Sequence, residues 1–237
     1  MTGSPMIFRQ LFDRTSCTYT YLIASGGEAC LIDPVFEQVE GYIRLLRELK
    51  LSLVMAVDTH LHADHVTGLG TLQARTQCLT VMGEQTAAEI VLLRVGDGDR
   101  VHVGDLELRA IHTPGHTDDS YCFRLSGAVF TGDTLLIRGT GRTDFQSGDA
   151  AAQYDSLFNK LLRLPDDTRV YPGHDYREAV STLSDEKQKN PRLTIASRDE
   201  FIQFMTSRHP PLPRKIQEAL EWNRTPIYRQ RGSGEGI

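Results

Sequence analysis

Residues 59–65 read Thr-His-Leu-His-Ala-Asp-His, and no other stretch constrains this chain as strongly. The apolar run Leu-Val-Met-Ala-Val lies just before them and is typical of a buried strand in a parallel sheet, whose carboxyl end is where open α/β sheets form ligand crevices. His60 and His62 point to the same side of an extended chain, whereas Asp64 is predicted to be a helix N-cap, followed by His65 in the first turn. Because a core would have difficulty satisfying three imidazoles and a carboxylate, the sequence predicts a metal site.

Three more polar motifs follow, each at the end of a predicted strand. Pro-Gly-His places His116 after a tight turn, Gly-Asp places Asp133 at a strand terminus, and a second Pro-Gly-His ends in His174. The candidate site therefore comprises His60, His62, Asp64, His65, His116, Asp133 and His174.

Composition narrows the function classes. The formal net charge of −5 over 237 residues argues against a nucleic-acid partner or an anionic membrane surface. No apolar stretch approaches the roughly 18 residues of a membrane span. The four cysteines are widely spaced, which favours buried reduced thiols over a disulfide framework and predicts a cytoplasmic location.

The residue pattern alternates between strands and helices. Strands are predicted at residues 7–12, 17–24, 29–32, 52–58, 78–82, 100–103, 105–112, 120–125, 127–131 and 168–171. Helices are predicted at residues 37–49, 65–75, 84–91, 149–163, 184–189, 198–206 and 213–222. Each half has a β-meander and then α/β alternation, so we predict an α/β fold with a four-layer αββα sandwich. We expect one domain over residues 1–237, with a C-terminal helical extension from about residue 184 to 237.

The four motifs occur in the order H-x-H-x-D-H, P-G-H, G-D, P-G-H, and this order resembles the metallo-β-lactamase superfamily over about residues 17–176. Residues 16–22, 136–146 and 190–194 further resemble the persulfide dioxygenases of the ethylmalonic-encephalopathy protein type, to about residue 215. We expect no fused rhodanese domain, so that a sulfur-transfer partner would be a separate protein.

The resemblance implies one Fe(II) per chain, held by His60, His116 and Asp133. Such a two-histidine, one-carboxylate set leaves adjacent coordination positions open. The implied reaction is the oxidation of glutathione persulfide by O₂ to sulfite and glutathione, and relatives are commonly homodimers. The other four candidates would orient the ligands through hydrogen bonds: His62, Asp64, His65 and His174.

Relatives that hydrolyse glutathione thioesters imply a substrate role for Arg142 and Tyr176. A guanidinium can bind a carboxylate through two parallel hydrogen bonds, which suits Arg142 to the glycine end of glutathione, although pairing with Asp144 is the alternative. Arg192 could add positive charge there. The loop at residues 177–182 departs from the pattern of these relatives, which puts one edge of that pocket in doubt.

The residues alone do not determine the identity or the number of the metal ions. A zinc pair would use the same seven side chains, with Asp133 as the bridging ligand, and would make the protein a glyoxalase II-like hydrolase of glutathione thioesters. The run Arg-Thr-Asp-Phe-Gln at residues 142–146 favours the dioxygenase, because the hydrolases carry a different sequence there.

Overall fold

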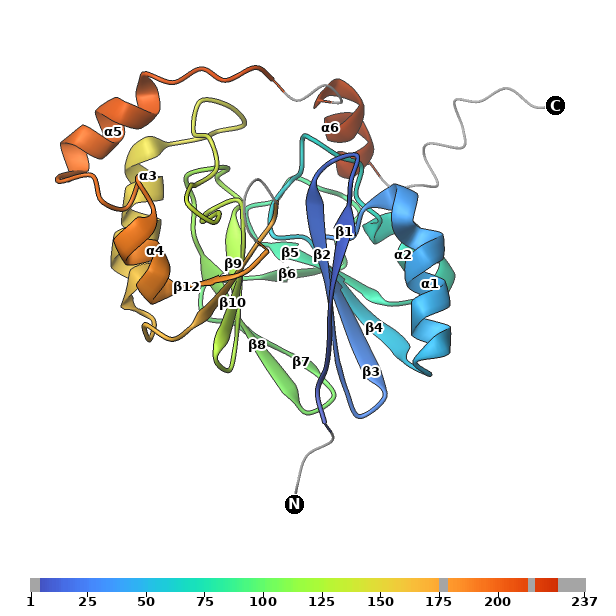
Figure 1. Cartoon of the computed structure of the whole chain (residues 1–237). Coiled ribbons are helices and arrows are strands. Elements are labelled where there is room, and N and C mark those ends of the chain that lie inside the picture. The colour runs from blue at the N-terminus through green and yellow to red at the C-terminus, as the bar shows by residue number, and fades with distance from the viewer. Residues whose placement is uncertain (1–4, 175–178, 213–215, 226–237) are drawn as a thin grey trace.

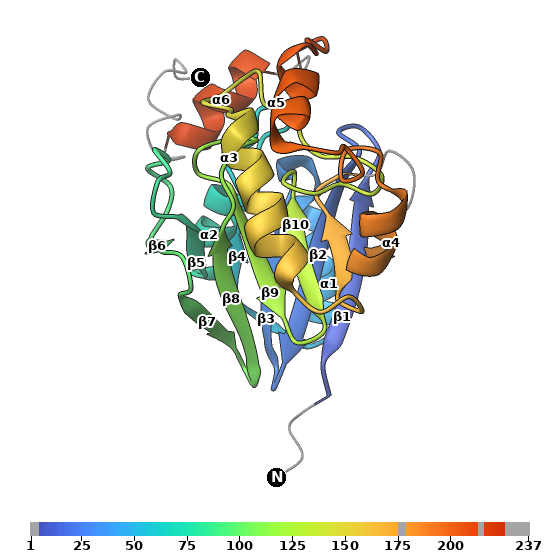
Figure 2. The same ribbon diagram turned by 90° about the vertical axis from the view of Figure 1, so that its left-hand side faces the viewer.

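Two six-stranded sheets pack face to face, and helices cover their outer faces (Figures 1 and 2). The computed structural model describes residues 5–174, 179–212 and 216–225, and the statements below concern these residues. The predicted four-layer αββα sandwich is confirmed.

The first sheet has the order β1-β2-β3-β4-β5-β6. Its strands are β1 (Ile7–Asp13), β2 (Thr18–Ser25), β3 (Glu28–Ile32), β4 (Ser52–Val57), β5 (Leu79–Gly83) and β6 (Leu93–Val95). Gly26 and Gly27 join β2 to β3 with positive φ angles of 60° and 86°, as the predicted two-residue hairpin turn requires. The strands from β3 to β6 run parallel, so their carboxyl ends meet at one edge of the sandwich.

The second sheet has the order β12-β11-β10-β9-β8-β7. Its strands are β7 (Arg100–Val103), β8 (Leu106–His112), β9 (Tyr121–Leu125), β10 (Ala128–Gly132), β11 (Arg169–Pro172) and β12 (Ser181–Thr182). The two-residue β12 was not predicted, because it is too short to show alternation.

Six α-helices accompany the sheets in the described part of the chain: α1 (Val39–Glu48), α2 (Leu69–Thr76), α3 (Ala150–Asp155), α4 (Leu183–Lys189), α5 (Arg198–Thr206) and α6 (Ile216–Arg224). In Figure 1, α1 and α2 lie outside the first sheet and α3 to α5 outside the second. The helix α3 begins at the N-cap Asp149, whose carboxylate accepts two backbone N–H groups, and continues through short π and 3₁₀ turns to Arg163.

Three apolar clusters separate the four layers. The central one lies between the sheets and is rich in aromatic side chains such as Tyr21 and Phe130, whose ring centroids are 5.0 Å apart. The other two lie under the helices of each outer face and include Leu22 and Val129, both fully buried.

The helix predicted at residues 65–75 is present, but its predicted start was wrong. Residues 65–68 are not helical, because the backbone of the segment bonds to neighbours: Phe36 N–H donates to Val66 O at 2.9 Å and Gly68 N–H to Pro34 O at 2.6 Å. The helix α2 starts at Leu69 with Gly68 as its N-cap, so Asp64 is no cap and His65 lies in a loop.

Residues 84–91 contain no helix either. The Thr86 hydroxyl accepts the Ala88 N–H group at 3.3 Å, and the Glu89 N–H group donates to Arg224 O at 2.9 Å. Bonds to a side chain and to a distant carbonyl replace those that a helix would need.

All four cysteines are free, and Cys30, Cys78 and Cys122 are buried, as predicted, whereas Cys17 is only half-buried, contrary to the prediction. Burial raises the pKa of the Cys122 thiol to about 12, which makes it unreactive at neutral pH. Among the described helices, none has both the length and the apolar composition that crossing a bilayer demands.

Candidate metal centre

The loop between β4 and α2 carries the first four candidate residues, and hydrogen bonds to carboxylates distant in the sequence hold its backbone in place. Asp33 accepts hydrogen bonds from the Thr59 N–H group at 2.7 Å and the Thr59 hydroxyl at 3.0 Å. Asp119 accepts the Leu61 N–H group through both oxygens, at 3.2 and 3.3 Å. The loop has no regular structure of its own, so such contacts determine where His60 and His62 lie.

The second sheet supplies His116 from the loop that follows β8. Gly115 precedes it with a φ of 140°, and a Cβ atom there would lie 2.3 Å from Gln153 Cα, so only glycine fits. His116 Nδ1 lies 2.8 Å from Arg142 O, and since a carbonyl only accepts, Nδ1 carries the proton. The other ring nitrogen, Nε2, is therefore left as a metal ligand.

Asp133 follows β10 and is surrounded by closely packed glycines. A Cβ atom on Gly173 would lie 2.7 Å from Asp133 Oδ1, and one on Gly132, whose φ is 47°, would lie 2.3 Å from Thr59 Oγ1. Gly132 thus lets the two sheet edges approach each other, and Gly173 leaves room for the Asp133 carboxylate.

The structure brings His60, His116 and Asp133 together: one ligand atom from each lies within 4.8 Å of the others. His116 Nε2 is 3.6 Å from Asp133 Oδ2, and the His60 and His116 ring centroids are 4.9 Å apart. The three predicted ligands therefore form one group that spans both sheets.

The remaining four candidates lie against this group. His62, Asp64 and His65 form a second cluster with ligand atoms within 4.8 Å of one another. His174 Nε2 is 3.4 Å from Asp64 Oδ2 and 3.5 Å from Asp133 Oδ1, and its Nδ1 is 3.2 Å from Cys17 O.

The hydrogen-bonding pattern fits a metal ion. His62 uses Nε2 toward Asp33 at 3.2 Å, while its Nδ1 is buried without a hydrogen-bond partner. His65 Nε2 and Asp133 Oδ1 are also buried and lack such a partner among the described atoms. Buried polar atoms are rarely left unsatisfied, so these atoms are consistent with ligands or close neighbours of a cation.

Protonation states agree with metal binding. Burial and the neighbouring imidazoles lower the pKa of His60 and His62 well below the usual value, so both rings are neutral at pH 7. Burial acts to raise the pKa of Asp133, but His174, His116 and His60 outweigh it and lower that pKa. Neutral imidazoles and an ionised carboxylate are the forms that bind metals.

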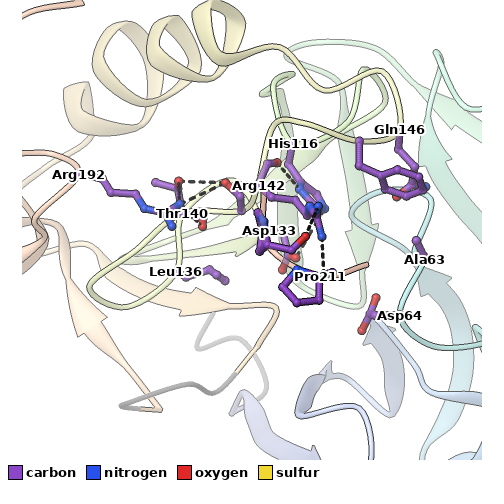
Figure 3. A pocket seen from close by; sticks show the side chains of 13 residues that line it. Ala63, Asp64, His116, Asp133, Leu136, Thr140, Arg142, Gln146, Arg192 and Pro211 are labelled. Atoms are coloured by element: carbon purple, nitrogen blue, oxygen red, sulfur yellow. Dashed lines mark hydrogen bonds and ion pairs between the residues drawn. The ribbon is translucent and has the colours of Figure 1, made fainter. Parts of the chain in front are cut away.

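A pocket of about 380 Å³ opens beside His116 and Asp133 (Figure 3). Arg142 lies on its wall, but its guanidinium already donates to both Asp144 oxygens, at 2.7 and 2.9 Å, and to the carbonyls of Pro210 and Pro211, at 2.8 Å each. The alternative of an Arg142–Asp144 pair is therefore present in the structure.

Arg192 also lines this pocket and donates from Nη1 to Thr140 O and Oγ1 at 2.6 Å each, as drawn in Figure 3. Burial lowers its pKa, as does the nearby Arg208. Asp64 and Asp133 line the same pocket and Arg142 is paired with Asp144, whereas the Thr140 groups to which Arg192 donates are neutral, so its charge suits this side of the pocket to an anionic group. The predicted substrate residue Tyr176 lies outside the described residues.

The family model of the metallo-β-lactamase superfamily matches residues 17–174, which include all seven candidate residues. The chain belongs to this superfamily. Within the superfamily it is 43% identical to the mitochondrial persulfide dioxygenase ETHE1 of Mus musculus, over 94% of this chain and 89% of the relative. The crystal structure of ETHE1 from Myxococcus xanthus matches with a TM-score of 0.90 and 49% identity, over 92% of this chain and 98% of that one.

A hydroxyacylglutathione hydrolase of Pelagibacter ubique is a more distant superfamily relative, 31% identical over 92% of this chain and 91% of its own. The comparisons thus favour the dioxygenase resemblance over the hydrolase.

Sequence reasoning missed the buried groups behind the ligands. Asp33, Asp58 and Asp119 are each at most 3% exposed, and Asn223 of α6 contacts the histidine loop. A charged residue directly after an apolar strand, as at Asp33 and Asp58, was the available signal. The residue pattern of α6 contains no signal that would have singled out Asn223.

Proposed function

We propose that this protein is a persulfide dioxygenase in which His60, His116 and Asp133 hold one Fe(II). The observation that carries the proposal is the convergence of these three side chains beside a pocket that His116 and Asp133 line, in a chain similar to ETHE1 along nearly its whole length. The balanced reaction converts a glutathione persulfide, O₂ and water to glutathione, sulfite and two protons.

The bound Fe(II) would supply adjacent open coordination positions for the two substrates. It would also provide a path for the electrons that the persulfide gives to O₂. The chain's own residues bind the substrate and orient the candidate ligands. Leu136 and Phe145 form apolar walls of the pocket, and Arg192 contributes a positive charge that suits a substrate with two carboxylates. His116 keeps its ring orientation because Arg142 O accepts its Nδ1 proton.

We further propose that Arg142 and Tyr176 contact the glutathione moiety. Because the Arg142 guanidinium already has four hydrogen bonds, a substrate carboxylate would have to displace the Pro210 and Pro211 carbonyls or bind the remaining N–H group. His62, Asp64, His65 and His174 would orient the ligands.

One observation favours a second candidate, a dizinc hydrolase of glutathione thioesters. His62, Asp64 and His65 form a second group of candidate ligands. His174 Nε2 lies between this group and the first, 3.4 Å from Asp64 Oδ2 and 3.5 Å from Asp133 Oδ1. The greater similarity to ETHE1 ranks this candidate second.

The test is the metal content of anaerobically purified protein, together with O₂ uptake on adding glutathione persulfide. We expect about one iron per chain and rapid uptake, lost in His116→Ala and kept in His102→Ala, a control at an exposed histidine of β7. Two zinc ions, no uptake and hydrolysis of a glutathione thioester would refute the dioxygenase and support the hydrolase.

The cytoplasmic location and the homodimer stay predictions. The mouse relative is named as mitochondrial, so imaging of a tagged chain in its own cells tests the first. Light scattering of purified protein tests the second.

A further inference from the structure

The histidine loop, defined as residues 58–68, has irregular backbone and depends on other segments for its hydrogen bonds. Asp33 and Asp119 bind its first half, and Gln146 Nε2 donates to Leu61 O at 2.8 Å. Its second half carries His65, and the segment after β3 bonds to its end: Phe36 N–H donates to Val66 O and Gly68 N–H donates to Pro34 O. A residue far along the chain supplies further hydrogen bonds to the loop.

Asn223 of helix α6 makes three hydrogen bonds to the backbone of the loop. Its Oδ1 accepts the Thr67 N–H group at 2.8 Å, and its Nδ2 donates to His62 O and His65 O at 2.9 Å each. The side chain is 2% exposed, so water does not compete for these groups. Only an amide offers one acceptor and two donors in this arrangement.

The helix that carries Asn223 is itself docked firmly. Ala219 is fully buried, and Leu220 packs against the apolar cluster of the first sheet and its helices. The Trp222 ring lies 6.3 Å from the Phe36 ring, and the Arg224 carbonyl accepts the Glu89 N–H group. Figure 1 shows α6 (red) above one end of the sheets. The amide of Asn223 is thus presented to the loop from a fixed support.

We propose that Asn223 is a positioning residue of the metal centre. It contacts no ligand side chain, but it binds the carbonyls of two histidines that flank Asp64, and so fixes the backbone from which the ligand loop projects. Without the amide, three buried backbone groups lose their partners, and the loop must rearrange to satisfy them. The inference rests on the proposed metal site.

The experiment measures Co²⁺ binding to the full-length chain by chelator competition and by the visible absorption of the bound ion. We expect Asn223→Ala to raise the dissociation constant by about 10- to 100-fold, the range typical of lost outer contacts of a metal site, and to change the absorption spectrum. Asn223→Asp keeps the acceptor but removes both donors, and is expected to weaken binding in the same direction. It provides a second measurement should the alanine variant fail to fold.

Leu220→Ala is the matched control, because it loosens the packing of α6 without removing any of the three hydrogen bonds. We expect it to lower the thermal midpoint of the metal-free protein while leaving the dissociation constant within about three-fold of wild type, a spread of roughly 0.6 kcal/mol. A purely structural role for Asn223 predicts instead that Leu220→Ala and the Asn223 variants weaken Co²⁺ binding in proportion to their loss of stability, and that result would overturn the proposal.

The proposed function can fail separately. If the wild-type chain binds Co²⁺ tightly and loses it in the Asn223 variants, but the iron-loaded chain takes up no O₂ with glutathione persulfide, the positioning role stands and the dioxygenase does not. If wild-type activity is present and the Asn223 variants bind Co²⁺ like wild type, the positioning role alone is refuted.

Discussion

Glu186 provides a sharp test of how the pocket wall is held. It lies on α4 with a fully buried side chain, and it accepts the Arg138 N–H group and the Asn190 amide at 2.9 Å each. It also forms an ion pair with the Arg138 guanidinium, which is 13% exposed. Asn190 in turn donates to the carbonyl of Gly139 at 3.0 Å. The carboxylate therefore fixes the segment that leads into the pocket.

Glu186→Ala leaves a nearly buried cation and a buried amide without their shared acceptor. Breaking a buried ion pair from one side costs about 3–5 kcal/mol, a large part of the roughly 5–15 kcal/mol by which domains are stable. We expect the free energy of unfolding, measured by urea titration of the metal-free chain, to fall by that amount.

Two comparisons decide whether the reasoning is right. Asp166→Ala removes the partner of Lys187 in a surface pair whose Asp166 side chain is 68% exposed, and is expected to cost less than about 1 kcal/mol. The double variant Glu186→Ala with Arg138→Met should be more stable than Glu186→Ala alone, because the guanidinium that has lost this carboxylate is removed as well. A loss below about 1.5 kcal/mol for Glu186→Ala, or no recovery in the double variant, would refute the account.

Other substitutions test separate features. Gly173→Ala would place a methyl group 2.7 Å from Asp133 Oδ1, so we expect a loss of about 1–3 kcal/mol in stability and weaker Co²⁺ binding, whereas Gly139→Ala, whose new atom would meet nothing nearer than 4.0 Å, should do neither. Gly41→Ala lies within α1 with free space around it, and calorimetry should show a gain of about 0.5–1 kcal/mol. Burial acts to raise the pKa of Asp13, but its hydrogen bonds outweigh it and lower that pKa below 3.8, so its stabilisation is present above about pH 4 and is lost as the pH falls through the lowered pKa. The stability gap between wild type and Asp13→Asn should therefore narrow in acid, and a gap that widens would contradict this.

The architecture was accessible from sequence because its strands alternate or run apolar and end in turn residues. The Gly26–Gly27 hairpin shows this well, since two positive φ angles are required there and glycine supplies them. The convergence of the candidate residues could also be predicted, because each follows a strand whose carboxyl end lies at the same edge, whereas the choice of three of them as ligands rests on the family resemblance.

The failures have a common physical cause. Residues 65–68 and 84–91 have compositions that suit a helix, but their backbone groups bond to distant segments instead. Asn223 illustrates the same limit from the other side: a polar residue on an amphipathic helix looks like a solvated one until the loop that it binds is in place. Local propensity cannot report contacts that are distant in sequence.

The aromatic layer between the two sheets has a consequence for the chemistry. His60 follows a strand of the first sheet, whereas His116 and Asp133 follow strands of the second. The distance from His60 to the other two therefore depends on the thickness of the aromatic layer between the sheets. Tyr21 and Phe130 are part of it. Their ring volumes act as a spacer, so the distances among the candidate ligands depend on side chains that are not themselves candidate ligands.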